Sequence, residues 1–291
     1  MATIEIVVGV AYSVTSLLLF TLNAMLLYTL LRNSEYKTGS YRIIKAMCIA
    51  CMLQLVPFIF GGAMTMAQNV FDYYLDRVLG VMVQSSWFLY ISLSVTLAVD
   101  RLLIFMCSKP AAFAFVTTSF LIGSCLFWLA TATTLSLPYC GHTYRDTLYV
   151  WINSEGSCSQ MLGVIEPYFD LSVFAIVLII YLVVFRYLLK LKKKSSSQTG
   201  SLNAELRILS VACISFVYES IFVMSTYWIL TEDTVATKIT LNAMWIVDCG
   251  LFTVVTLVIS GSLRKKVIET VFKNRAKKNS STITVVTVLA R

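Results

Sequence analysis

The sequence predicts an all-α membrane protein, a seven-transmembrane helix bundle with its N-terminus outside and its C-terminus in the cytoplasm. Three observations predict this fold: a hydrophobic share of 58% with only 13% charged residues, seven long apolar stretches, and an uneven placement of the basic residues. A soluble globule of 291 residues needs more polar surface than this composition supplies. We therefore expect one membrane domain.

Each apolar stretch is long enough to cross a bilayer as a helix. A transmembrane helix needs about 20 apolar residues to span roughly 30 Å of hydrocarbon. One such stretch could be a buried helix of a soluble protein, but seven leave no soluble shell around them. The first stretch ends at Arg32 and follows no positive segment, so we expect an inserted helix rather than a cleaved signal peptide. The seven stretches comprise residues 6–31, 43–67, 79–106, 113–137, 165–189, 208–230 and 239–260.

The basic residues lie almost entirely in every second gap between these stretches. Of the 23 Lys and Arg residues, only Arg77, Arg145 and Lys238 lie in the second, fourth and sixth gaps. Because positive loops remain cytoplasmic, the first, third and fifth gaps and the C-terminal tail are expected inside. The net charge of +8 then indicates contact with anionic membrane lipid, not with nucleic acid.

After the seventh stretch the chain becomes basic and amphipathic. Leu263, Val267 and Val271 recur at helical spacing among Lys and Arg residues, which predicts a short helix along the inner leaflet. The final residues are rich in Ser, Thr and Val, and we expect them to be disordered. The predicted parts are thus a seven-transmembrane domain (1–261), a basic amphipathic segment (262–279) and a tail (280–291).

The eight cysteines divide by their expected depth. Five lie inside apolar stretches, where cysteine behaves as a small apolar residue, and Cys107 lies on the cytoplasmic side near the membrane. Cys140 and Cys158 alone share the oxidising outer side, in the loop between the fourth and fifth stretches. We expect these two to form a disulfide that closes the loop, which could fold over the mouth of the bundle.

The third stretch ends in a charged pair at its cytoplasmic edge. Asp100 and Arg101 lie within the sequence LAVDRLL, and charges at this depth are costly unless they face the bundle interior. Here the chain resembles the rhodopsin-like G-protein-coupled receptors, whose third helix ends in an Asp-Arg-Tyr signature in a similar context. The resemblance implies that Arg101 contacts the G protein and that Asp100 restrains it. An ordinary interfacial anchor is the alternative.

Other marks of that superfamily are mixed. Asn23, Trp128 and Pro167 match residues that it favours in the first, fourth and fifth helices. The usual aspartate of the second helix, the proline of the sixth and the Asn-Pro-x-x-Tyr motif of the seventh are missing. These absences argue against the usual sodium site and the usual activation hinges.

The departures point to a narrower resemblance. Together with GSYRII at residues 39–44 and RIL at residues 207–209, they are similar to the nematode serpentine chemoreceptors, the Srt and Srx classes above all. This resemblance implies olfactory detection of an environmental or pheromone-like small molecule and signalling to a heterotrimeric G protein. It also implies a multi-pass protein of the plasma membrane, in the ciliary membrane of a sensory neuron.

A ligand pocket is expected in the outer half of the third stretch. Gln84, Trp87 and Ile91 fall at i, i+3 and i+7 and therefore share one helix face. Arg101 lies about 21 Å further along the helix at 1.5 Å per residue, within about 40° of the direction of Trp87. One helix would then join an outer pocket to an inner switch, with simple helix packing as the alternative role of Trp87.

Three acidic residues lie inside apolar stretches without a basic residue at the same depth. They are Asp170 in the fifth stretch, Glu219 in the sixth and Asp248 in the seventh. Ionised groups at membrane depth are costly and rarely lack a role. The three acids either contact the ligand or, for the last two, form a polar network with partners such as Tyr218 and Asn242.

An enzyme is not expected, and neither is a metal or a cofactor. His142 is the only histidine and lies in an outer loop, which excludes His-rich metal sites and His-based triads. A retinal-bound light sensor is disfavoured because the seventh stretch lacks a mid-membrane lysine. The main rival function is a transporter or channel that uses the intramembrane acids, although no inverted repeat is visible. A non-signalling decoy receptor is a third hypothesis, and the oligomeric state stays open.

Overall fold

The computed structural model describes residues 2–36, 39–106, 110–194 and 199–270. Within these ranges, seven helices are long and apolar enough to cross a membrane, which confirms the predicted seven-helix class. Residues 271–279 of the predicted basic segment and the predicted tail, 280–291, lie outside the described residues. The seven helices are α1 (Ala2–Arg32), α2 (Gly39–Ala67), α3 (Tyr73–Met106), α4 (Pro110–Leu135), α5 (Ser157–Lys194), α6 (Thr199–Met224) and α7 (Val235–Ile259).

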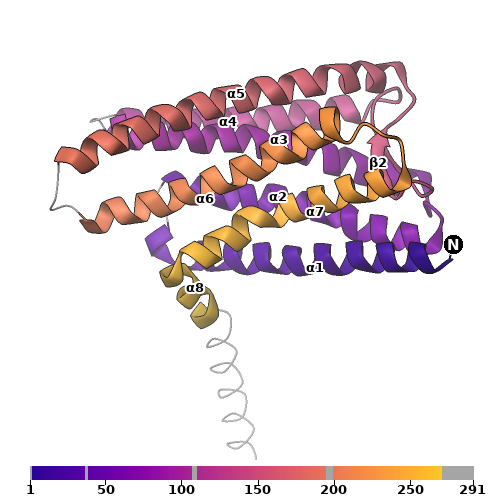
Figure 1. Cartoon of the computed structure of the whole chain (residues 1–291), viewed down its shortest axis with the longest axis horizontal. Helices are drawn as coiled ribbons and strands as arrows, with labels where there is room; N and C mark the ends of the chain where they lie inside the picture. Colours follow the sequence, from indigo (N-terminus) through magenta and orange to yellow (C-terminus); the bar gives the residue numbers. More distant parts are fainter. Residues whose placement is uncertain (1, 37–38, 107–109, 195–198, 271–291) are drawn as a thin grey trace, which may run out of the picture.

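The helices lie side by side along the long axis of the molecule (Figure 1). Helix α1 packs against α2 and α7, and α3 packs against α2, α4 and α5. Helix α3 also contacts α6, and a larger share of its most apolar window is buried than in any other of these seven helices. It is therefore the central helix of the bundle, with buried residues along its length from Asp76 to Arg101.

The two ends of the bundle differ in what they carry. One end holds the N-terminus of α1 and a β-hairpin made of β1 (His142–Arg145) and β2 (Val150–Asn153); we call it the hairpin end (Figure 1). The opposite end holds η1 (Ser34–Tyr36), a 3₁₀ turn, and α8 (Gly261–Ile268), a short helix after α7; we call it the α8 end. The central helix α3 connects these two ends.

Large apolar side chains cover the outer sides of the helices. Val7, Leu17, Phe115, Leu126 and Ile179 are each more than half exposed, although all belong to membrane-length helices. A water-facing surface rarely holds so much contiguous apolar area, whereas lipid solvates it without cost. The exposed apolar sides are therefore the lipid-facing sides of a membrane protein.

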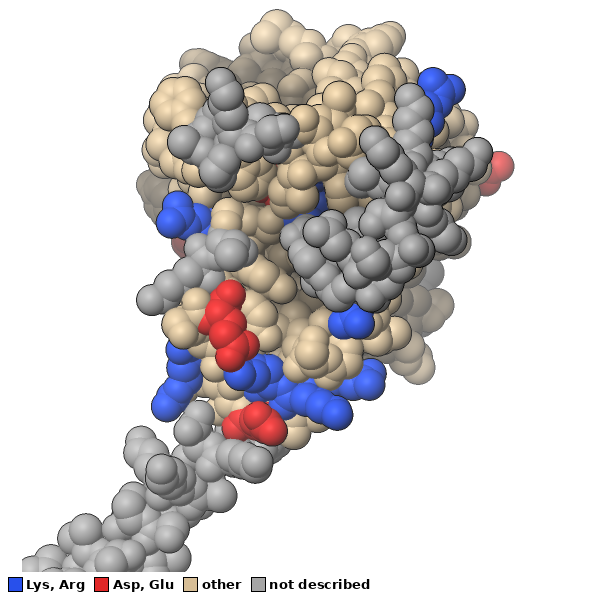
Figure 2. All heavy atoms as spheres, turned by 90° about the vertical axis from the view of Figure 1, so that its left-hand side faces the viewer, with Lys and Arg blue, Asp and Glu red and all other residues tan. Residues whose placement is uncertain are grey.

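Basic side chains gather at the α8 end. Figure 2 looks onto this end, and Lys and Arg side chains lie around the described surface, most densely where α8 lies. Lys266 of α8 donates to Glu35 of η1 at 3.0 Å, which joins the two short elements. Other basic residues at this end are Arg32, Arg42, Lys45, Arg207, Arg264 and Lys265.

The hairpin forms a cover over the opposite end. Its strands are antiparallel, with Tyr144 opposite Trp151 in the register. Cys140 and Cys158 form a disulfide with a Cα–Cα distance of 4.9 Å, which joins the two ends of the loop that contains the hairpin. Thr65 of α2 and Tyr144 share a hydrogen bond of 2.5 Å, so the hairpin is tied to the bundle below it.

Helix α3 and the hairpin approach one another closely. Asp76 of α3 accepts a hydrogen bond of 2.9 Å from the backbone N–H of Tyr144. At Gly80, one helical turn further along, a Cβ atom would collide with the carbonyl of His142. The missing side chain at Gly80 is therefore what lets the hairpin rest on the helix.

Candidate functional site

A cavity of about 470 Å³ opens at the hairpin end, between α3, α5, α6, α7 and β2; we call it the hairpin cavity. Its volume lies within the range of about 300–1,000 Å³ that is typical of small-molecule sites. A π-helical turn, η2 (Ser225–Ile229), continues α6 and contributes to its wall. The side chains that carry its chemistry are Gln84, Trp87, Glu166, Asp170, Tyr227 and Trp245.

Aromatic rings from three helices form one wall of the hairpin cavity. Trp87 of α3 lies with its ring centre 5.7 Å from that of Phe222 of α6 and 5.9 Å from that of Trp245 of α7. The centres of Phe222 and Trp245 are 6.1 Å apart. Such ring separations are typical of favourable aromatic contacts, so the wall is held in place from α3, α6 and α7 together.

Trp245 is also held from behind by a polar residue. Its indole N–H donates to the Oε1 atom of Gln54 on α2 at 2.9 Å. The amide nitrogen of Gln54 in turn donates to the backbone carbonyl of Ser86 on α3 at 3.4 Å. One buried glutamine therefore connects a ring of the cavity wall to two further helices.

Two acidic side chains of α5 lie on the same cavity, one helical turn apart. Gln84 of α3 donates to the Oε1 atom of Glu166 at 2.5 Å. Asp170 is fully buried, and among the described residues neither of its carboxylate oxygens has a partner at hydrogen-bond distance. The polar groups of Trp87 and Tyr227 are the donors nearby. Asp170 is thus an acceptor that the protein positions but does not satisfy.

The hairpin side of the cavity adds an imidazole and an indole. His142 and Trp151 line it, and the Nδ1 atom of His142 lies 3.0 Å from Oδ1 of Asn153, its partner across the strands. Burial lowers the pKa of His142 to about 4, so the ring is neutral at pH 7. Lys238 lies at the cavity and pairs with the exposed Asp233 at 3.0 Å.

Glu219 and Asp248 lie deeper than the hairpin cavity and do not line it. Tyr90 of α3 donates to Oε1 of Glu219 at 2.8 Å, whereas Tyr218 donates to the backbone carbonyl of Met244. The hydroxyl partner of Glu219 is therefore Tyr90 and not the expected Tyr218. Asp248 is buried and interacts electrostatically with Glu219. The Oδ1 atom of Asp248 has no hydrogen-bond partner among the described residues.

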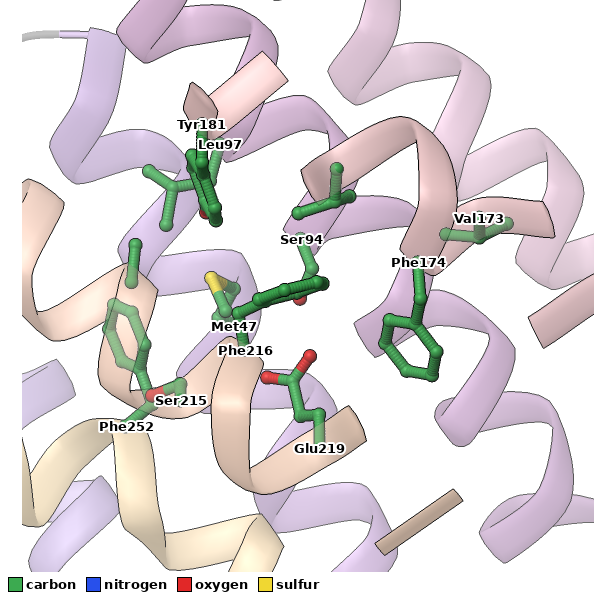
Figure 3. A pocket seen from close by; sticks show the side chains of 12 residues that line it. Met47, Ser94, Leu97, Val173, Phe174, Tyr181, Ser215, Phe216, Glu219 and Phe252 are labelled. Atoms are coloured by element: carbon green, nitrogen blue, oxygen red, sulfur yellow. The ribbon is translucent and has the colours of Figure 1, made fainter. Parts of the chain in front are cut away.

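Glu219 belongs instead to a small second cavity in the middle of the bundle. Figure 3 shows its carboxylate directed into a space among Ser94, Phe174 and Phe216. The volume of about 10 Å³ is at the lower limit for one water molecule. This space is too small for a ligand, so the structure separates Glu219 from the site formed by Gln84, Trp87 and Asp170.

Asp100 and Arg101 form a closed polar cluster at the α8 end of α3. Both side chains are fully buried, and the Arg101 guanidinium donates to Oδ2 of Asp100 at 2.5 Å. Ser40 of α2 donates to the same oxygen at 2.7 Å and accepts from Arg101, while Thr117 of α4 donates to Oδ1 at 3.4 Å. The pair is therefore held by α2 and α4 and is shielded from solvent.

The arrangement is that of a bundle of seven membrane-length helices among the described residues, with a cavity at one end and a buried ion pair at the other. The chain is similar to squid rhodopsin in its crystal structure, with a TM-score of 0.74 over 94% of this chain and 86% of that chain. The sequence identity is 13%, so this likeness shows the fold alone.

The family is shown by sequence. The family model of the serpentine type 7TM GPCR chemoreceptor Srx matches residues 14–259. The chain therefore belongs to the Srx family, one of the two classes that its motifs resemble, and it is a G-protein-coupled chemosensory receptor. Such a receptor is a multi-pass membrane protein and belongs to a non-enzyme class. No protein with a curated description matches the chain in sequence.

Of the residues expected at the ligand site, the structure brings Gln84, Trp87 and Asp170 together. Three further residues of the hairpin cavity were not predicted from the sequence, namely Glu166, Tyr227 and Trp245. A signal for Glu166 was present, because it precedes Asp170 by four residues and so shares its helix face. No comparable signal existed for the two aromatic residues, whose positions depend on how α6 and α7 pack.

Proposed function

We propose that the hairpin cavity is the ligand site of this chemoreceptor and that the hairpin end faces outside. The basic residues of the α8 end support this orientation, because positive segments remain on the cytoplasmic side. The disulfide Cys140–Cys158 supports it as well, because disulfides persist in the oxidising outer compartment. A small environmental or pheromone-like molecule then reaches the hairpin cavity from outside.

The α8 end is proposed to couple to a heterotrimeric G protein. The support is the buried Asp100–Arg101 pair, which stands at the cytoplasmic end of the same helix whose other end carries Trp87. This coexistence on α3 is the single observation that carries the proposed function. A ligand-driven shift of α3 would expose Arg101 to the G protein by loosening its contacts with Ser40 and Asp100. The proposed location is the plasma membrane, in the cilium of a sensory neuron.

The orientation is tested with epitope tags at both termini in intact cells. Antibody should reach the N-terminal tag without permeabilisation and the C-terminal tag only after it. If antibody reached the C-terminal tag in intact cells, the proposed orientation would be refuted.

The ligand site and the coupling are tested in the same cells with a calcium reporter and a panel of volatile and pheromone-like small molecules. Trp245→Leu should weaken responses at least tenfold in potency, and Arg101→Ala should abolish them at equal surface level. The matched control is Trp228→Leu, because Trp228 is exposed and does not line the cavity. Equal potency in Trp245→Leu and Trp228→Leu would refute the hairpin cavity as the site. Binding without any signal would identify a decoy receptor.

A further inference from the structure

The charge inside the hairpin cavity is strongly one-sided. Glu166 and Asp170 both line it, are both buried, and lie one turn apart on α5. Among the described lining residues the only Lys or Arg is Lys238, which is paired with Asp233. The chain therefore supplies two acids to the cavity and no unpaired cation to neutralise them.

Asp170 is the sharper of the two observations. A carboxylate taken out of water needs a counter-charge or several donors, because its desolvation is otherwise among the largest penalties in a protein. The structure gives both oxygens of Asp170 full burial and no partner at hydrogen-bond distance within the described residues. An acceptor that is kept in place and left unsatisfied, on the wall of a cavity of ligand size, indicates that the missing donor comes from a bound molecule.

The surrounding groups favour one kind of donor. Gln84 donates to the Oε1 atom of Glu166, and the Tyr227 side chain lies close to both Glu166 and Asp170. Trp87, Trp245 and Tyr227 line the same cavity, and aromatic faces attract cations within about 6 Å of the ring centre. Two carboxylates and several aromatic rings around one space are complementary to an ammonium group attached to an apolar or aromatic body.

We infer that the hairpin cavity selects a small organic amine in its protonated form. Its ammonium group donates to Asp170 and lies beside the carboxylate of Glu166, and its apolar part lies against Trp87 and Trp245. This inference rests on the proposed function and narrows it to a class of ligand. The alternative is a neutral ligand that accepts a hydrogen bond from the protonated carboxyl group of Asp170 or Glu166. The experiment below distinguishes a protonated amine from such a neutral ligand.

The probes are two matched pairs: 2-phenylethylamine with 2-phenylethanol, and tryptamine with indole-3-ethanol. Each pair differs only in the amine and the hydroxyl group. Binding is measured on the purified full-length receptor in lipid nanodiscs, by ligand-dependent Tm and by titration calorimetry. We expect each amine to bind at least about tenfold more tightly than its alcohol, because hydrogen bonds between two charged groups are roughly twice as strong as neutral ones.

Asp170→Asn keeps the shape of the side chain and removes its charge. It should weaken amine binding about tenfold or more and leave alcohol binding within about threefold, since only the amine loses a charge-assisted bond. Glu166→Gln is the second variant and should act in the same direction if Asp170→Asn is poorly expressed. Glu232→Gln is the matched control, because Glu232 is exposed in the loop between η2 and α7, and it should change neither affinity.

Three results would overturn the inference: alcohols that bind as tightly as the amines, amine binding that Asp170→Asn leaves intact, or no amine binding at all. The proposed function has a separate test in Trp245→Leu. If the alcohols bind and Trp245→Leu removes that binding, the cavity remains the ligand site and only the cationic ligand class is lost. If any probe binds with the same affinity to Trp245→Leu, the cavity itself is refuted as the site.

Discussion

The two ends of the bundle hold buried charges in opposite conditions. At the α8 end, Arg101, Ser40 and Thr117 all donate to Asp100, so this buried carboxylate has its counter-charge and its hydrogen-bond donors from the chain. At the hairpin end, Asp170 is equally buried and has no described partner at hydrogen-bond distance. The difference teaches which cluster is complete without a ligand and which is not. The α8 cluster is complete within the chain, and the unpartnered carboxylate of Asp170 is the feature on which the proposed ligand class rests.

The largest effect is expected when the buried pair at the α8 end loses one of its two charges. Asp100→Ala would leave the buried guanidinium of Arg101 without its carboxylate, and removal of one partner from a buried pair costs about 3–5 kcal/mol. We expect a large fall in the Tm of the purified receptor and in its surface level. The double variant Asp100→Leu with Arg101→Met removes both charges and should recover most of the loss. A double variant as unstable as Asp100→Ala would mean that the pair is not the cause.

The opposite change makes the hairpin end resemble the α8 end. Asp170→Asn replaces a buried carboxyl group without a described hydrogen-bond partner by an amide that cannot ionise, so the ligand-free receptor should become more stable, by up to about 3 kcal/mol. The measurement is the Tm of the receptor without ligand, compared with that of Glu232→Gln, which should not change. A lower Tm for Asp170→Asn would show that the chain already satisfies this carboxylate.

A smaller effect on stability is expected from His142, which lies in the hairpin that covers the cavity. Burial lowers the pKa of His142 to about 4 from about 6.5 in the unfolded chain, so the folded state favours the neutral ring. The contribution of the buried neutral ring to the free energy of unfolding is complete above about pH 6.5 and is lost as the pH falls toward 4. By pH 5 the loss should reach about 2 kcal/mol. The fall in Tm between pH 7.5 and pH 5 should therefore be larger for the native receptor than for His142→Gln, and an equal fall would contradict the prediction.

The sequence was sufficient for the architecture because lipid imposes simple rules. Apolar spans of the required length predicted seven membrane helices, and the described residues contain seven helices of that length, with ends that extend beyond the apolar stretches into polar segments. Spacing on one helix also predicted correctly that Trp87 and Arg101 are both buried. The family follows from short motifs together with their departures from the superfamily pattern, and the Srx match agrees with them.

The sequence was insufficient wherever the answer depended on how helices rotate against one another. An acidic residue in the apolar stretch of α6 or α7 is expected to face the bundle interior. Its position in the sequence does not tell which residue of another helix contacts it. Glu219 thus accepts a hydrogen bond from Tyr90 of α3 and lines a separate small cavity, and Trp245 of α7 donates to Gln54 of α2. Such pairs join residues more than a hundred positions apart, and no local period encodes them.

The bond between Trp245 and Gln54 has a mechanical consequence. The indole both lines the hairpin cavity and anchors the helix packing, because Gln54 also donates to the backbone of α3. A molecule that turns this ring must either break the bond to Gln54 or draw α2 along with it. Trp245 therefore connects the wall of the hairpin cavity to α2 and to α3, and α3 is the helix that carries Arg101.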